Sequence, residues 1–229
     1  MPFQDLPERL AAVRETIERA RQRGGRGQEV RIVAVTKTYG PEAPMAVWHA
    51  GLHDVGENRV QEAVTKMAQL EGGLDLHWHL IGHLQRNKVK QLDGFRLVHS
   101  MDSARLADAL AAYGVARGRP VDVLMQVNVS GEGSKGGYDP SSVAAEGERL
   151  HRLPGLIVRG VMTMAPFDAP EATLRTVFAG ARRCGEVLHA AGHPATELSM
   201  GMSGDYEIAV EEGATLVRLG TVLFGARPA

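Results

Sequence analysis

Apolar residues near the start of the chain recur at helical spacing. Leu6, Leu10, Val13 and Ile17 are separated by four, three and four positions, so they share one face of a helix. The glycine-rich turn at 24–27 ends this segment, because glycine is favoured just beyond a helix end. The sequence therefore predicts an amphipathic helix ahead of the rest of the fold.

Beyond this helix, short apolar runs alternate with longer helical patterns. Several runs are apolar on both faces, which is typical of parallel strands covered by helices. The runs predict strands at 30–36, 52–55, 76–81, 96–99, 121–128, 157–162, 196–199 and 215–219. The segments between them predict helices at 41–50, 59–70, 85–92, 103–117, 141–153, 173–191 and 203–212.

The number of βα units decides the fold class. Eight such units in 229 residues fit a closed barrel better than an open parallel sheet, which usually has fewer strands. No repeat, low-complexity run or linker interrupts the pattern. We therefore predict one α/β domain over residues 1–229, a (β/α)₈ (TIM) barrel with an additional N-terminal helix.

Composition narrows the range of functions. A net charge of −1 gives no overall field that would attract nucleic acid or an anionic membrane. The single cysteine, Cys184, excludes an internal disulfide and lies in a predicted helix, where we expect it to be a buried small apolar residue. The N-terminal segment is amphipathic and charged rather than apolar, so we expect no signal peptide, no membrane span and a cytoplasmic protein.

Lys37 is the first candidate for chemistry. It follows the strand Val30-Arg-Ile-Val-Ala-Val-Thr at the carboxyl end, which is where barrels place reactive groups. Partial burial there would favour the free amine and its attack on an aldehyde. On its own, a lysine at a strand end is more often a solvated charge.

The loops after the seventh and eighth predicted strands form the second candidate. Gly220 and Thr221 follow the last strand, where a short terminal helix can start, and Ser199-Met-Gly-Met-Ser203 follows the strand before it. Barrels often bind phosphate with these two loops, because unpaired backbone N–H groups at a helix start attract anions. Ordinary turns, with Ser203 as a helix N-cap, are the alternative interpretation.

Arg218 stands in the otherwise apolar last strand. A buried arginine needs a partner, which could be a barrel carboxylate in an ion pair or the ring nitrogen of a ligand. An aldehyde-reactive lysine, a phosphate site and such an arginine together describe pyridoxal 5'-phosphate (PLP).

His77, His79 and His83 raise the question of a metal site. No cysteine set or carboxylate pair completes a zinc pattern, so we predict no metal site.

A series of short motifs from about residue 6 to 227 resembles the pyridoxal phosphate homeostasis protein family. They include Ile32-Val-Ala-Val-Thr-Lys37, Gly56-Glu-Asn, His79-Leu-Ile-Gly-His-Leu-Gln-Arg-Asn-Lys88, Lys135-Gly-Gly, Leu198-Ser-Met-Gly-Met-Ser203 and Val217-Arg-Leu-Gly-Thr. The resemblance implies a fold type III-like PLP barrel, similar to the N-terminal domain of alanine racemase, with a Schiff base to Lys37. It further implies phosphate between Ser203 and Gly220–Thr221, Arg218 at the pyridine nitrogen, and Asn58 in the pocket.

The resemblance also bears on activity. An arginine at the ring nitrogen leaves that nitrogen unprotonated, which weakens the ring as an electron sink. The sequence ends shortly after the eighth strand, so we expect no second domain to supply the further acid/base group of a racemase. We therefore expect no catalytic residue, and a carrier, favoured as a monomer, that holds PLP and delivers it to apo-forms of PLP enzymes. A small PLP-dependent amino-acid racemase is the alternative.

Overall fold

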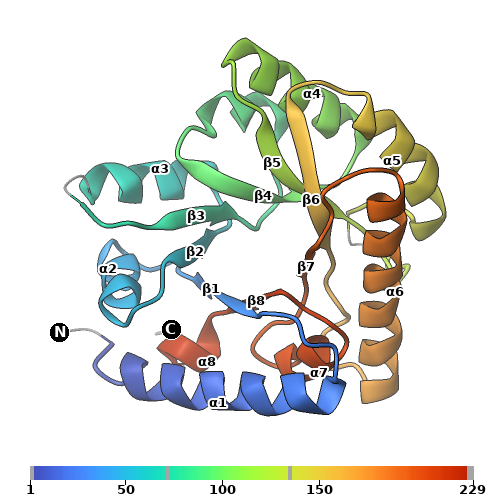
Figure 1. Cartoon of the computed structure of the whole chain (residues 1–229). Helices are drawn as coiled ribbons and strands as arrows, with labels where there is room; N and C mark the ends of the chain where they lie inside the picture. The colour runs from blue at the N-terminus through green and yellow to red at the C-terminus, as the bar shows by residue number, and fades with distance from the viewer. Residues whose placement is uncertain (1–2, 71–72, 134–135, 226–229) are drawn as a thin grey trace.

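Eight parallel strands close into a barrel in the order β1 to β8, with β8 paired to β1 (Figure 1). The computed structural model describes residues 3–70, 73–133 and 136–225. The strands are β1 Arg31–Val35, β2 Asp54–Glu57, β3 His77–Leu80, β4 Phe95–Met101, β5 Val121–Gln126, β6 Leu156–Met162, β7 Glu197–Ser199 and β8 Leu216–Leu219. Every predicted strand is present, with ends displaced by no more than two residues. The predicted (β/α)₈ barrel is confirmed.

Helices follow the strands around the outside of the barrel. They are α1 Leu6–Gly24, α2 Glu42–His49, α3 Val60–Gln69, α4 Ala104–Ala116, α5 Val143–His151, α6 Glu171–Ala190, α7 Tyr206–Glu211 and α8 Thr221–Phe224. Two short 3₁₀ helices are η1 Arg86–Gln91 and η2 Pro140–Ser142. Within the described part of the chain, none of the helices has the length and apolar character that a membrane span requires.

The segment predicted as a helix at 85–92 is the 3₁₀ helix η1 rather than an α-helix. Its apolar residues Val89 and Leu92 are both buried and lie three positions apart. In a 3₁₀ helix residues three apart are aligned on one side, so this geometry buries both. The segment lacks the wider apolar stripe that would stabilise an α-helix.

The predicted N-terminal helix is confirmed as α1, and it braces the closure of the barrel. Its buried face contains Leu6, Leu10, Val13 and Ile17, and Gly25 ends it in the left-handed conformation with φ 63°. Figure 1 shows α1 running alongside α7 and α8. Arg23 of α1 forms ion pairs with Glu207 and Glu211 of α7. Helix α1 thereby supports the helices that flank the last strand, β8.

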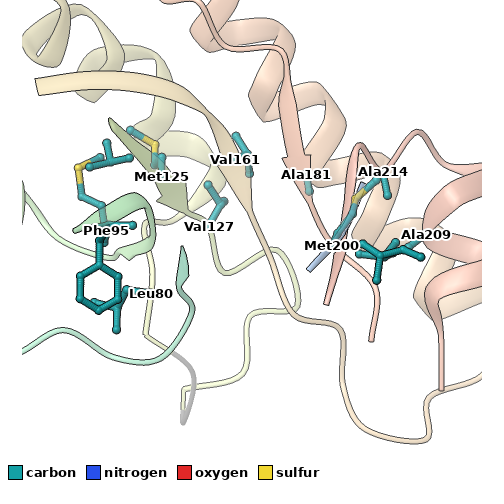
Figure 2. Packing of buried hydrophobic residues seen from close by; sticks show 14 of the residues in the cluster. Leu80, Phe95, Met125, Val127, Val161, Ala181, Met200, Ala209 and Ala214 are labelled. Atoms are coloured by element: carbon teal, nitrogen blue, oxygen red, sulfur yellow. The ribbon is translucent and has the colours of Figure 1, made fainter. Parts of the chain in front are cut away.

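The core has two parts, one between strands and helices and one inside the barrel. In the outer part, Figure 2 shows Met125, Val127 and Val161 packed together along β5 and β6. The inner part is a small apolar cluster made by Val33, Leu97, Leu124, Met162 and Leu216. Buried polar residues share the barrel interior with this cluster, including His99, Ser199 and Arg218.

Candidate functional site

Lys37 lies at the carboxyl end of β1, where it is half-buried. Alternate residues of a strand point to the same side, and Val33 belongs to the apolar cluster inside the barrel. Val35 has the same parity as Val33, so it faces the barrel interior, and Lys37 lies in the turn two residues beyond it. This places Lys37 at the mouth of the barrel, as the sequence predicts.

Strands β8 and β2 flank β1 and bring two other predicted site residues to the same end. Val35 pairs with Gly56 of β2, and continuing this register by two residues places Asn58 level with Lys37. On the other side, a Cβ atom at Gly220 would lie 3.6 Å from the Cβ of Val35. Lys37, Asn58 and Gly220 therefore follow three neighbouring strands, β1, β2 and β8, at one end of the barrel.

The turn after Lys37 is strained. Thr38 has a φ of 71°, which is rare for a β-branched residue. Its backbone N–H donates a hydrogen bond to Oε1 of Glu62, at 2.7 Å. Strained residues that surrounding groups hold in place often occur at functional sites. Helix α3, which carries Glu62, thus fixes the backbone directly beyond Lys37.

A buried charge cluster fixes the backbone on the other side of Lys37. The Lys66 ammonium donates to Glu57 Oε1 at 2.7 Å, to Glu62 Oε1 at 3.0 Å and to the Thr36 carbonyl oxygen at 2.9 Å. Burial raises the pKa of Glu57, although the hydrogen bonds from Lys66 and Thr36 act in the opposite direction. Glu57 Oε2 has no hydrogen-bond partner among the described residues, which agrees with that raised pKa.

The sequence reasoning missed this cluster. The carboxylate in Gly56-Glu-Asn, at a buried strand end, was one available signal. The four-residue spacing of Glu62 and Lys66 in a predicted helix was another, because such a pair shares one helix face. Neither signal indicates that the two meet beside Lys37, since that contact joins different elements.

The two loops predicted to bind phosphate do meet. Ser203 Oγ accepts hydrogen bonds from the backbone N–H groups of Gly220 and Val222, each at 3.3 Å. These N–H groups lie at the start of α8, where a helix leaves donors without intrahelical partners. Val222 was not predicted as part of the site, and it follows from the position of α8.

Ser203 is not the N-cap of α7, although its hydroxyl accepts from N–H groups at the start of α8. Helix α7 begins at Tyr206 and leaves Ser203 outside, in the loop after β7. The loop packs tightly on α7, because a Cβ atom at Gly201 would lie 2.6 Å from the Cβ of Ala209 and Gly201 has a φ of 91°. Figure 2 shows Met200 packed beside Ala209. This packing turns Ser203 away from α7 and toward α8.

Arg218 is buried inside the barrel. Its Nη1 donates to the carbonyl oxygen and to Oγ of Ser199, each at 2.7 Å, and its Nη2 donates to the carbonyl oxygen of Thr163 at 2.9 Å. Burial lowers the pKa of Arg218 to about 10, so the group stays charged near neutral pH. A guanidinium carries more N–H donors than these three bonds use, which leaves donors for a ligand.

The ion-pair alternative for Arg218 is wrong within the described residues. Its partners are two carbonyl oxygens and a hydroxyl, and no described carboxylate lies within ion-pair distance. The direct partners of the cation are therefore neutral acceptors, and the carboxylate of Asp205 acts on it without forming an ion pair.

Two further predicted residues lie at the edge of the site. Asn58 directly follows β2. Its backbone lies so close to Gly82 that a Cβ atom built at Gly82 would lie 2.4 Å from the Asn58 carbonyl oxygen. Thr221 is the first residue of α8 and is exposed. Their roles in binding stay predictions.

The histidines serve hydrogen bonding. His77 and His79 share one side of β3, as predicted, and both contact Asp54 Oδ1, at 3.4 Å and 2.8 Å. His83 is mostly exposed and pairs with Asp102 at 3.0 Å. The described residues contain no group of His, Cys, Asp or Glu side chains that could hold a metal ion.

Cys184 and the glycine-rich stretch are two further features of the sequence. Cys184 is buried in α6, as predicted, and burial raises the pKa of its thiol. In the glycine-rich stretch, residues 131–133 and 136–137 lie in a loop, and Ser134 and Lys135 lie outside the described residues.

Known proteins resemble the chain over nearly its whole length. The family described as "Alanine racemase, N-terminal domain" matches residues 9–228. A pyridoxal phosphate homeostasis protein of Aquifex aeolicus is 43% identical over 223 residues, which is 96% of this chain and 97% of that protein. The solved structure of PipY from Synechococcus elongatus with PLP bound has a TM-score of 0.84 and 38% identity, covering 96% of this chain and 100% of that chain.

A more distant likeness concerns the fold alone. An alanine racemase of Clostridium difficile has a TM-score of 0.77 at 15% identity, covering 100% of this chain and 57% of the racemase chain. Because the match to the Aquifex protein and to PipY extends over almost the full length of both, the chain belongs to the pyridoxal phosphate homeostasis protein family, with the barrel of the alanine racemase N-terminal domain.

Proposed function

We propose that this chain binds PLP through Lys37, holds it, and delivers it to apo-forms of PLP enzymes in the cytoplasm. One observation carries this proposal. Lys37 follows β1, the Ser203–Gly220 contact joins the loops after β7 and β8, and Arg218 lies within β8, so the three groups belong to neighbouring units of one barrel. The names of the relatives and the PLP bound to PipY support it.

The groups at this end match the groups of PLP. The backbone N–H groups of Gly220 and Val222 and the hydroxyl of Ser203 suit a phosphate, since donors at a helix start favour an anion. The remaining donors of Arg218 suit an unprotonated ring nitrogen. When bound, PLP supplies an aldehyde carbon for a lysine amine and a ring that can withdraw electrons.

The residues around Lys37 have a positioning role in this proposal. Lys66 holds the carbonyl of Thr36 and Glu62 holds the N–H of Thr38, so the backbone on both sides of Lys37 is fixed. A fixed backbone lowers the entropic cost of placing the amine next to the aldehyde. The site is thus prepared for binding before the ligand arrives.

Arg218 disfavours decarboxylation and transamination, but not racemisation. Although burial lowers its pKa to about 10, the guanidinium stays charged near neutral pH, so it donates to the ring nitrogen and leaves that nitrogen unprotonated. An unprotonated ring is a poor electron sink. The likeness to alanine racemase keeps a small amino-acid racemase as the second candidate.

A transfer assay separates the two candidates. The PLP-loaded protein is mixed with an apo-form of a PLP enzyme, and the recovered activity of that enzyme reports delivery. In parallel, a panel of L-amino acids is incubated with the loaded protein and assayed for D-isomers. We expect delivery without turnover, and Lys90→Ala, which changes an exposed lysine, should behave as the parent chain. Steady production of D-isomers that is lost in Lys37→Ala would establish the racemase instead.

A further inference from the structure

A continuous chain of hydrogen bonds crosses the inside of the barrel from Asp54 to Arg218. Asp54 Oδ1 lies 2.8 Å from His79 Nε2, and His79 Nδ1 lies 2.8 Å from His99 Nε2. His99 Nδ1 lies 2.8 Å from Ser199 Oγ, which in turn lies 2.7 Å from Arg218 Nη1. We call these five residues the relay. They come from β2, β3, β4, β7 and β8.

The chemistry of the end groups sets the direction of every bond. Arg218 can only donate and the ionised Asp54 can only accept, so with neutral histidines Ser199 Oγ accepts from Arg218 and gives its own proton to His99 Nδ1. A neutral His99 then carries its proton on Nε2 and donates to His79 Nδ1. His79 carries its proton on Nε2 and donates to Asp54. The reverse direction would turn a nitrogen lone pair of His79 toward the Asp54 carboxylate.

The interior of the barrel favours neutral histidines. Burial lowers the pKa of His99 well below its usual value, and the nearby charges of Arg218 and Arg31 lower it further. Burial also lowers the pKa of His79, where the charges of Arg31 and Arg96 act in the same direction and Asp54 acts against it.

Asp54 is the charged group at the far end. Burial would raise its pKa, but the hydrogen bond from His79 and the charges of Arg31 and His77 outweigh burial, so the pKa lies below its usual value. The relay therefore has one anion at one end and one cation at the other, with neutral groups between them.

The relay adds an anion to the surroundings of Arg218, on which the charge of Asp205 also acts. A buried cation needs compensation, and no described carboxylate forms an ion pair with Arg218. In the relay, each group turns its acceptor toward Arg218 and its donor toward Asp54, and hydrogen bonds in such a series polarise one another. A carboxylate in direct contact would instead occupy the donors that a ring nitrogen needs.

We propose that Asp54 acts through His79, His99 and Ser199 to stabilise Arg218 and to hold its guanidinium oriented for a ligand's ring nitrogen. Asp54, His79 and His99 are then positioning residues. The ligand part of this inference rests on the proposed function, whereas the relay itself does not. Asp54 lies at the amino ends of the strands and lines a groove of about 740 Å³ beside α1, at the opposite end of the barrel from Lys37.

The first test determines which ring nitrogens of His79 and His99 are protonated in the protein without PLP. NMR of ¹⁵N-labelled histidines near neutral pH should show His79 and His99 neutral and protonated on Nε2. Asp54→Asn should change the ring signals of His99, which Asp54 does not touch. Asp122→Asn is the matched control, since Asp122 pairs with Arg159 outside the relay. A proton on Nδ1 of either ring, or a doubly protonated ring, would overturn the proposal.

The second test is a double-mutant cycle between Asp54 and Arg218, again without PLP. Urea unfolding should show that Asp54→Asn raises the unfolding equilibrium constant about 10-fold alone, and less than about 3-fold when Arg218 is Met. Asp122→Asn should change the unfolding equilibrium constant by the same factor in the parent chain and in Arg218→Met. If Arg218→Met fails to fold, Ser199→Ala replaces it and breaks the relay at its centre. Additive effects would contradict the coupling.

The third test adds PLP. Asp54→Asn should weaken PLP binding about 5-fold, in the range by which residues along a coupled network act, with Asp122→Asn unchanged. Unchanged PLP affinity in Asp54→Asn would overturn the positioning role. Failure of the parent chain to bind PLP would contradict the proposed function alone, because the first two tests need no ligand.

Discussion

Lys37 stands between two threonines whose backbone groups are held by helix α3. The carbonyl of Thr36 accepts from Lys66, and the N–H of Thr38 donates to Glu62. A lysine at a strand end has no special chemistry by itself, and here its position is set by side chains that approach from another element. The sequence located Lys37 from the end of an apolar strand, but the contacts around it depend on which helix packs there.

We expect Lys66→Met to be strongly destabilising. The substitution keeps most of the side-chain volume but leaves Glu57 and Glu62 without their shared cation in a buried position. Removing one partner of a buried ion pair typically costs about 3–5 kcal/mol. Urea unfolding measures the loss. Lys90→Met, at an exposed lysine, should stay near the parent, and equal stability of the two variants would contradict the burial argument.

We expect Ser203→Ala to weaken PLP binding with little effect on the fold. The change removes the hydroxyl that accepts from Gly220 and Val222, and with it one donor for the phosphate. Loss of one such hydrogen bond to a charged group corresponds to about a 10-fold change in affinity. A PLP titration followed by absorbance measures it. Ser141→Ala, at an exposed serine in η2, is the control, and equal affinity of both variants would remove Ser203 from the site.

At the scale of elements, the strands were predictable and the connections between them less so. The short apolar runs and their β-branched residues located the strands, because each strand is a local pattern that is buried on both faces. Helix α7 starts at Tyr206 rather than Ser203, since the loop before it packs on α7 and reaches α8. The relay was not predictable, because His99 and Ser199 lie 100 positions apart and meet only across the closed barrel.

Close pairing of β6 and β7 gives a prediction at this scale. Gly160 has a φ of 153°, and a Cβ atom there would lie 1.8 Å from the carbonyl oxygen of Glu197. Gly160→Ala should therefore push the strands apart and destabilise the protein by about 3 kcal/mol or more. Thermal or urea unfolding measures the effect. Gly133→Ala has open space around the new methyl group and should change little, so similar losses in both variants would contradict the close approach.

At the scale of the whole molecule, the barrel interior combines an apolar cluster with a polar path. The fold class followed from counting βα units, and the mouth of the barrel followed from the fold. The path inside the barrel gives stability a pH dependence, since His79 and His99 have lowered pKa values in the folded state. In the unfolded chain both titrate near their usual value.

We therefore expect stability to fall as the pH drops below the histidines' usual pKa of 6.5 and to be retained above it. The unfolded state takes up more protons there than the folded state, at a cost of about 1 kcal/mol at about pH 5.5 for a histidine that stays neutral in the folded state. Urea midpoints at about pH 7.5 and 5.5 measure this. His99→Gln should reduce the pH-dependent loss, whereas His189→Gln, at an exposed histidine, should keep it. An equal loss in both variants would contradict the assignment.

The central claim is that Lys37 carries PLP. The most direct measurement is borohydride reduction of the PLP-loaded protein, followed by mass spectrometry of its peptides. We expect a pyridoxyl group fixed on Lys37, an absorbance of bound PLP that is lost in Lys37→Ala, and both signals retained in Lys90→Ala. A pyridoxyl group on another lysine, or unchanged bound PLP in Lys37→Ala, would contradict it.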